Sequence, residues 1–282
     1  MRLFRLLLLL GVTALWTGCG LPDSYYLQPP AVGIQATPLG TPFTITGTDR
    51  GSDTGATFEG YELYYKFYGS AGGPGDPSFN SDLTSFTTGS TNIDLQQAGF
   101  HRLCLGPNNA GLNADTSAGF ASAPLINIKQ ILENLSDPAT DINTSYTVTI
   151  RLNDLFPTYP APTVPTNGPP LSYYLYTRSG ATAAIAYAEV RRFVNAQTGS
   201  LCKSFAPNST LPSPLVNWDA PAFQDVDLSG TTGNAIWNEV LANSGNIYVM
   251  IYALSYGKSI VDFTPIYSSP VLLGYVTAVV EP

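Results

Sequence analysis

The stretch from residue 61 to residue 68 reads Tyr-Glu-Leu-Tyr-Tyr-Lys-Phe-Tyr. Successive side chains of a β-strand point to opposite faces of a sheet, so this alternation predicts a strand. We expect an inward face made of Tyr61, Leu63, Tyr65 and Phe67. The other face, which we expect to meet water, holds Glu62, Tyr64, Lys66 and Tyr68.

Similar short stretches recur along the chain, and Gly, Pro, Asn and Asp clusters separate them. Residues 43–46 and 146–150 are two examples, rich in Thr, Ile and Val. With 17 Tyr and 13 Phe the chain also has enough apolar surface to fold, although only 11% of its residues are charged. An average soluble domain has about 25%. The pattern predicts an all-β protein of the sandwich class.

The chain also contains an internal near-repeat. Residues 103–111 (LCLGPNNAG) precede Ser122-Ala123-Pro124, and residues 249–257 (VMIYALSYG) precede Ser268-Ser269-Pro270. The interval from glycine to proline is 13 residues in both halves. Each half resembles the final hairpin of fibronectin type III-like (Ig-like) domains, which implies two tandem β-sandwich domains.

From this resemblance we expect one sandwich domain over residues 33–129 and a second over residues 146–282. Residues 130–145 would supply a short helical turn and a linker. The Pro-rich segment 157–170 is then an extended loop inside the second domain, between strands 146–152 and 171–177.

The first residues carry a targeting signal. A basic start (Met1–Arg5) is followed by the apolar run 6–16 and by Thr17-Gly18-Cys19. This order is typical of a secretory signal peptide. It resembles the lipobox of bacterial lipoproteins, with Trp16 at the usual leucine position, and such relaxed boxes are typical of spirochaete lipoproteins. The resemblance implies removal of residues 1–18, acylation (diacylglycerol, palmitate) of Cys19 and residues 19–32 as a lipidated tether.

The net charge of the chain argues against nucleic acid as a partner. Loss of Arg2 and Arg5 with the signal takes Lys+Arg from 12 to 10 against 20 acids, so the net charge moves from −8 to −10. An acidic chain without a basic cluster is not expected to bind nucleic acid. The lipid would hold it at the membrane of the bacterial cell envelope, which we expect to be the outer membrane. The surface and periplasmic faces both stay open.

Two cysteines, Cys104 and Cys202, remain besides Cys19. An oxidising compartment permits one disulfide between them, and two separate thiols are the alternative. If Cys104 points away from Leu103 and Leu105, a bridge to Cys202 would join the two halves.

Residues for catalysis or metal binding are scarce. His101 is the only histidine, and alternation places it beside Leu103, so we expect it at the edge of the core rather than as a catalytic base. Residues 225–230 begin like a calcium loop, but Ile236 stands where a bidentate carboxylate is needed. Asp219 and Glu239 leave calcium as a weak alternative. We expect no cofactor, no metal site and no enzymatic activity.

The remaining candidates for ligand contact are aromatic. Tyr64 and Tyr68 lie on the face expected to be wet and could stack on a glycan or anchor a protein. The competing interpretation is lateral packing in a Tyr-rich sheet or contact between the two domains. The sequence favours a non-enzymatic binding or adhesion lipoprotein with a protein or glycan ligand. The alternatives are a periplasmic structural component of an envelope complex and an extracytoplasmic carbohydrate-active enzyme.

Overall fold

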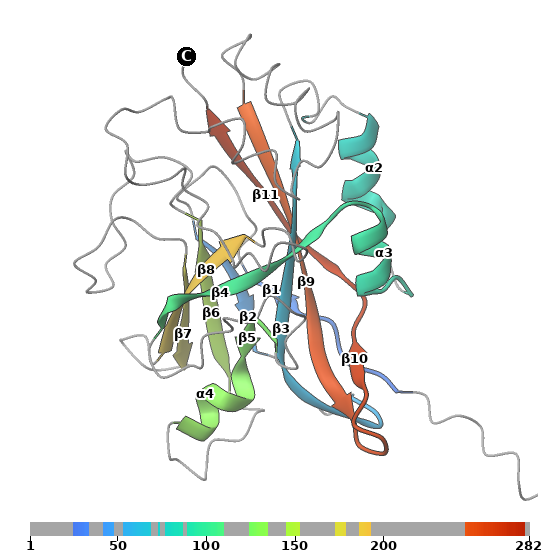
Figure 1. The fold of residues 1–282 in the computed structure, drawn as a ribbon, viewed down its shortest axis with the longest axis vertical. Coiled ribbons are helices and arrows are strands. Elements are labelled where there is room, and N and C mark those ends of the chain that lie inside the picture. Colours follow the sequence, from blue (N-terminus) through green and yellow to red (C-terminus); the bar gives the residue numbers. More distant parts are fainter. Residues whose placement is uncertain are drawn as a thin grey trace, which may run out of the picture.

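Antiparallel strands make up most of the fold (Figure 1). A computed structural model describes residues 25–33, 42–47, 53–68, 73, 77–86, 89–109, 124–134, 145–152, 173–178, 186–192 and 246–279. Every pairing between the described strands is antiparallel. The predicted all-β class is therefore confirmed.

The first sheet has the order β1-β2-β6-β7-β8-β4. Its strands are β1 (Ala31–Val32), β2 (Phe43–Thr46), β6 (Tyr146–Arg151), β7 (Tyr173–Arg178), β8 (Ala186–Arg192) and β4 (His101–Asn109). The expected neighbours β6 and β7 pair over their full lengths, from Tyr146 with Arg178 to Arg151 with Tyr173. This pairing confirms the two strands predicted on either side of the Pro-rich segment, which itself lies outside the described residues.

The second sheet is built around two long strands. It contains β3 (Ala56–Tyr68), β9 (Asn246–Ser259), β10 (Pro265–Tyr267), β11 (Val271–Val279) and β5 (Ile126–Asn127). The strand predicted at residues 61–68 is the second part of β3, and it pairs with β9 along its whole length. β4 joins the two sheets, because His101 and Arg102 pair with β3 whereas Leu103 and the residues after it pair with β8.

A bulge in β3 shows why one glycine is needed. The register of β3 against β9 shifts between Phe58 and Gly60, and β5 pairs with β3 at Gly60. A Cβ on Gly60 would collide with the backbone oxygen of Ile126. Only glycine therefore lets β5 approach the bulge this closely.

Three short helices complete the described fold. They are α2 (Pro77–Ser85), α3 (Asn92–Gln97) and α4 (Ile128–Asn134). Thr91 and Asp94 form a capping box at the start of α3. α4 confirms the helical turn predicted after residue 130, and it begins two residues earlier.

The two sheets share one hydrophobic core. Side chains of β2, β6 and β7 cluster there with side chains of β3, β9 and α4. The predicted inward face of β3 belongs to this cluster, since Tyr61, Leu63, Tyr65 and Phe67 are all buried in it. Packed sheets of this kind have a sandwich-like arrangement.

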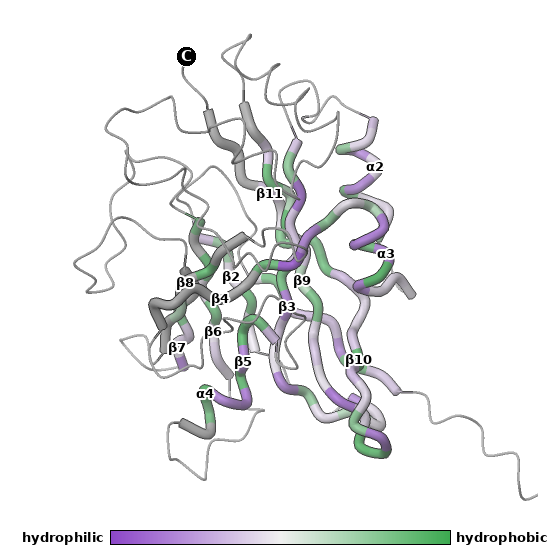
Figure 2. Tube along the Cα trace, in the orientation of Figure 1, coloured by the Kyte–Doolittle hydropathy of each residue, from purple (hydrophilic) through white to green (hydrophobic). Residues whose placement is uncertain are grey.

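A second apolar cluster lies on the other face of β3 and β9. It joins Tyr64 and Tyr68 of β3 to Met250, Tyr252 and Leu254 of β9, and it also contains Phe79, Leu95 and Phe100. In Figure 1, α2 and α3 lie along this side of the sheet. The hydropathy colouring shows apolar positions recurring along both strands and on the helices (Figure 2).

The division into two tandem domains is not what the described strands show. β2 and β3 fall in the first predicted domain, yet they pair with β6 and β9 of the second. β4 likewise pairs with β8 across the expected linker. Both sheets therefore draw strands from both halves, and the boundary expected at residues 130–145 does not separate them.

The tether is also shorter than the sequence suggested. Leu27 is buried in the main core, and Tyr26 pairs with Thr54 through two backbone hydrogen bonds of 2.9 Å. The backbone oxygen of Gln28 accepts a 2.6 Å hydrogen bond from the Ser255 hydroxyl. Residues 26–32 thus belong to the folded body, whereas Cys19 lies outside the described residues.

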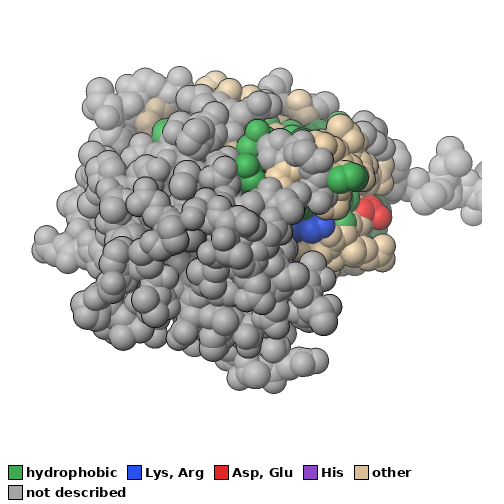
Figure 3. Space-filling view, turned by 90° about the horizontal axis from the view of Figure 1, so that it is seen from above, with side chains coloured by type: hydrophobic (Ala, Val, Ile, Leu, Met, Phe, Trp, Pro, Cys, Tyr) green, Lys and Arg blue, Asp and Glu red, His purple; other side chains and the backbone are tan. Residues whose placement is uncertain are grey.

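Charged side chains are few on the described part of the surface, seen from above in Figure 3. Hydrophobic and uncharged polar atoms cover most of the described area, with small patches of Lys or Arg and of Asp or Glu. This agrees with the low charged fraction of the chain, 11%.

Candidate functional site

The face predicted to be wet is buried. Tyr64 is 1% exposed, Tyr68 is 3% exposed and Glu62 is 1% exposed. The expectation that Tyr64 and Tyr68 are exposed ligand-binding aromatics is therefore wrong. The physical reason is that α2 and α3 pack over them with Phe79 and Leu95. Lateral packing within a Tyr-rich sheet accounts for part of this burial, through Met250 and Tyr252 of β9, and the covering helices account for the rest.

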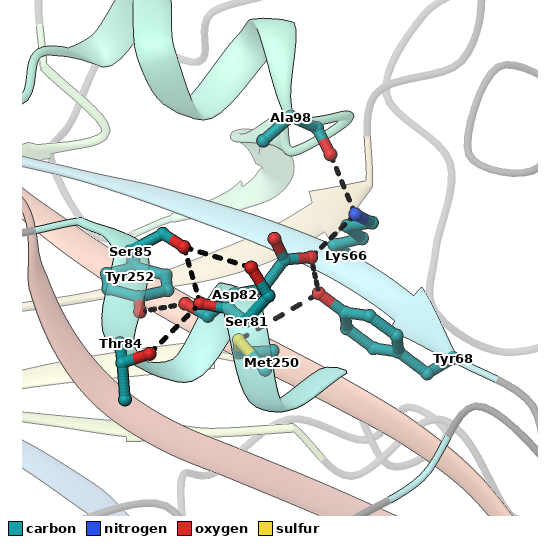
Figure 4. Close-up of polar contacts among 9 residues, drawn as sticks. All are labelled: Lys66, Tyr68, Ser81, Asp82, Thr84, Ser85, Ala98, Met250 and Tyr252. Atoms are coloured by element: carbon teal, nitrogen blue, oxygen red, sulfur yellow. Dashed lines mark hydrogen bonds and ion pairs between the residues drawn. The ribbon is translucent and has the colours of Figure 1, made fainter. Parts of the chain in front are cut away.

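A carboxylate anchors α2 to this face (Figure 4). One oxygen of Asp82, Oδ2, lies 2.7 Å from Lys66 Nζ and accepts a 2.5 Å hydrogen bond from the Tyr68 hydroxyl. Lys66 Nζ also donates to the backbone oxygen of Ala98 at 2.7 Å, just after α3. The Tyr252 hydroxyl donates to the Asp82 backbone oxygen at 2.5 Å. Lys66 and Asp82 thus hold both helices on β3 and β9.

A second buried ion pair lies on the same strand. Arg102 of β4 approaches the Glu62 carboxylate to 3.0 Å, and the Tyr64 hydroxyl donates to the other carboxylate oxygen at 3.0 Å. Burial raises the pKa of Glu62, while Arg102 and the Tyr64 hydrogen bond act in the opposite direction. Burial is also the main reason why the pKa of Tyr64 lies far above its ordinary value, with the Glu62 charge adding to it.

The next acid along β3 is shared between two lysines. Glu59 lies 3.2 Å from Lys258 and 3.6 Å from Lys129. Burial raises the pKa of Tyr256 to about 12, and the charges of Glu59 and Glu62 contribute. This part of the sheet therefore concentrates ionisable groups, each of them close to an opposite charge or a hydroxyl.

The chemistry open to these acids is limited by access. A general acid or base must come within about 2.6–3.2 Å of the group that it protonates or deprotonates. Glu62 is 1% exposed, and both of its oxygens already face Arg102 or Tyr64. In this conformation the Glu62, Glu59 and Asp82 carboxylates hold strands and helices together.

His101 lies where alternation predicted it. It is half-buried next to the Tyr65 ring, at 6.1 Å between ring centroids, and Leu103 of the same strand is fully buried. This placement agrees with a histidine at the edge of the core. The side chain of Cys104, together with Cys202, Asp219, Glu239 and residues 225–230, lies outside the described residues.

An exposed apolar turn was missed by the sequence reasoning. It connects β9 to β10, and its side chains are exposed by 60% at Ile260, 62% at Val261 and 73% at Phe263. Figure 2 shows apolar colouring at this tip. The signal is present in the sequence, since three large apolar residues, Ile260, Val261 and Phe263, lie between Gly257 and Pro270.

Two tyrosines of the N-terminal segment lie beside Thr54 and Gly55, and Gly55 contacts this turn. Ile260 donates its backbone N–H to the Gly55 oxygen at 3.1 Å. Gly55 has a φ of +63°, and a Cβ there would lie 2.8 Å from the Tyr25 ring. Tyr25 and Tyr26 are 38% and 47% exposed. We call Tyr25, Tyr26, Ile260, Val261 and Phe263 the apolar tip.

Within the described ranges, no three His, Cys, Asp or Glu side chains gather closely enough to hold a metal ion. The helices described here are all too short or too polar to cross a bilayer. No protein-family model matches the chain, and no curated protein and no solved structure matches it either.

Proposed function

We propose that this chain is a lipid-anchored envelope protein that binds a protein or glycan partner and catalyses no reaction. The observation that carries the proposal is the N-terminal sequence, in which Cys19 follows an apolar run and two small residues. Two or more acyl chains at such a cysteine give stable membrane anchoring.

The folded body begins close to the proposed anchor. Only six residue steps separate Cys19 from Tyr25, and a chain of that length spans about 20 Å at most. Because Leu27 is buried in the core, the linker cannot lengthen without unfolding that segment. The protein would therefore sit close to its membrane.

The buried acids Asp82, Glu62 and Glu59 serve the fold. Each of them faces a lysine or arginine, as charges do when they stabilise a fold. The segments that connect the strands would then supply the contact surface, as loops commonly do on rigid sheets.

The anchor is tested by acylation in bacterial cells. Cys19→Ala should abolish incorporation of labelled palmitate and release the protein from the membrane fraction. Cys104→Ala is the matched control and should keep the label. Equal labelling of the Cys19→Ala variant and the parent chain would refute the anchor.

Binding at the surface is tested by protease treatment of intact cells, with lysed cells as the control. Digestion on intact cells places the protein outside and makes screens of proteins and glycans the next step. Protection until lysis would refute adhesion and favour a structural role in a periplasmic complex.

A further inference from the structure

The backbone N–H groups of residues 260–264 in the β9–β10 turn, which carries most of the apolar tip, all find acceptors in the protein. Ile260 donates to the Gly55 oxygen, Phe263 to the Ser259 oxygen, and both Val261 and Asp262 to the Ser259 hydroxyl. Thr264 donates to the Asp262 carboxylate at 3.2 Å. Each satisfied donor lowers the cost of moving this turn out of water.

The apolar side chains of the same turn are exposed to solvent, although its backbone N–H groups bond inside the protein. Phe263 is 73% exposed although its φ is +60°, a region that non-glycine residues seldom adopt. A strained backbone that presents an aromatic ring to solvent is a reason to look for a binding role. Tyr25 and Tyr26 add two amphipathic rings, the type enriched at membrane–water interfaces.

The apolar tip also lies at the end of the molecule that is nearest to the proposed anchor at Cys19. Tyr25 is at most about 20 Å of chain from Cys19, and it is next to Gly55, which contacts the turn. In Figure 1 the first described residues, coloured blue, lie near the loop that joins β9 to β10. An acyl chain at Cys19 would therefore bring this tip to the membrane surface.

We propose that the apolar tip docks on the phospholipid bilayer that holds the anchor, with Phe263, Ile260 and Val261 entering the interface. This inference rests on the proposed lipid anchor. Docking would give the body a fixed orientation, with the helices α2 and α3 held away from the membrane.

The charges around the tip set the depth of insertion. Asp262 is exposed, and hydrogen bonds from Ser259 and Thr264 hold its pKa below the ordinary value, so it stays ionised. Lys258 faces Glu59. An ionised carboxylate within the turn keeps the insertion shallow, at the level of the headgroups. The contact is apolar, so salt should not weaken it.

The test measures whether the tip enters lipid. The mature chain carries a hexahistidine tag in place of Cys19 and is tethered to phosphatidylcholine–phosphatidylethanolamine vesicles by a nickel-chelating lipid. Phe263→Trp reports insertion through quenching by brominated phosphatidylcholine, after subtraction of the parent signal from Trp218 and Trp237. Ile93→Trp is the matched control, because Ile93 is 56% exposed on α3.

We expect strong quenching and a blue shift for Phe263→Trp, unchanged in 1 M NaCl, and neither for Ile93→Trp. In a second measurement, a chain from Gly20 with one myristoyl group binds vesicles reversibly. Phe263→Ser should lower its partition constant roughly tenfold, the effect of exposing one large apolar side chain. Ile93→Ser should leave the constant unchanged.

Equal quenching at the two positions, or an unchanged partition constant for Phe263→Ser, would overturn the proposal and make a protein the better candidate occupant. Neither assay uses acylation of Cys19. A failure of the tip is therefore distinguishable from a failure of the anchor, which the palmitate experiment reads separately.

Discussion

Two aromatic regions of the β3–β9 ladder meet opposite environments. At one end, Phe79 is completely buried between α2 and the sheet, in edge contact with Tyr68 and Tyr275. Just beyond the other end of the ladder, Phe263 projects from the β9–β10 turn with 73% of its surface exposed. Both regions hold large apolar side chains, so the difference lies in what covers them. The helices cover the first, and the protein itself leaves the second uncovered.

The largest expected effect is a difference in stability between variants at the two phenylalanines. Phe79→Ala should lower the free energy of unfolding by about 3–5 kcal/mol, because it empties a packed site that four aromatic rings share. Phe263→Ala should change it by less than about 0.5 kcal/mol, as surface substitutions usually do. Urea unfolding of both variants measures the difference. Similar losses would mean that the turn packs against the body in solution.

The next effect concerns the ion pair beneath α2. Asp82→Ala should lower the free energy of unfolding by about 2–3 kcal/mol, because it leaves the half-buried Lys66 without its carboxylate. Adding Lys66→Met should recover part of the loss, since the charge left behind is gone. A double-mutant cycle in urea measures the coupling. Additive losses would show that the pair does not hold the helix.

The sequence predicted the inner face of the sheet but not the covering of the outer face. Alternation at residues 61–68 identifies two faces, and it cannot say which faces are covered. A covering helix could have been predicted in part, because Phe79, Leu83 and Phe86 have the spacing of one helix face. The hydrogen bonds and ion pair of Asp82 could not be predicted from the sequence, since Lys66 and Asp82 meet only after α2 packs on the sheet.

The pairing of the strands was the second feature that the sequence did not predict in full. The near-repeat predicted a final hairpin in each half. It is right in the second half, where β11 folds back on β9, although the turn falls after Ser259 rather than at Gly257. It is wrong in the first half, where β5 pairs with β3 and not with β4. The same repeat suggested two independent halves, whereas β3 pairs with β9 along its length. A local pattern specifies that a strand forms and which residues share a face. Its partner is chosen by contacts between residues far apart in sequence.

A smaller effect appears in alkaline solution. Burial raises the pKa of Tyr256 to about 12, whereas a tyrosine in the unfolded chain titrates near 10. The stabilisation from keeping this hydroxyl protonated is therefore complete below pH 10 and is lost as the pH rises towards 12. Tyr256→Phe should make the decline of unfolding free energy with pH shallower by up to about 1.4 kcal/mol per pH unit. Urea titrations between pH 9 and 11 measure the slope, and equal slopes in variant and parent would contradict the assignment.

The smallest effect concerns the backbone of the exposed turn. Phe263→Gly should raise the free energy of unfolding by about 1 kcal/mol, because glycine adopts a φ of +60° without the penalty that a side chain brings. Phe263→Ala keeps the penalty and is the control. Thermal unfolding of the two variants at neutral pH measures the difference, and equal midpoints would mean that the turn is relaxed with phenylalanine in place. A gain in stability for Phe263→Gly would mean that Phe263 is held in a strained conformation that folding alone does not favour, as expected of a residue that acts by contact with another surface.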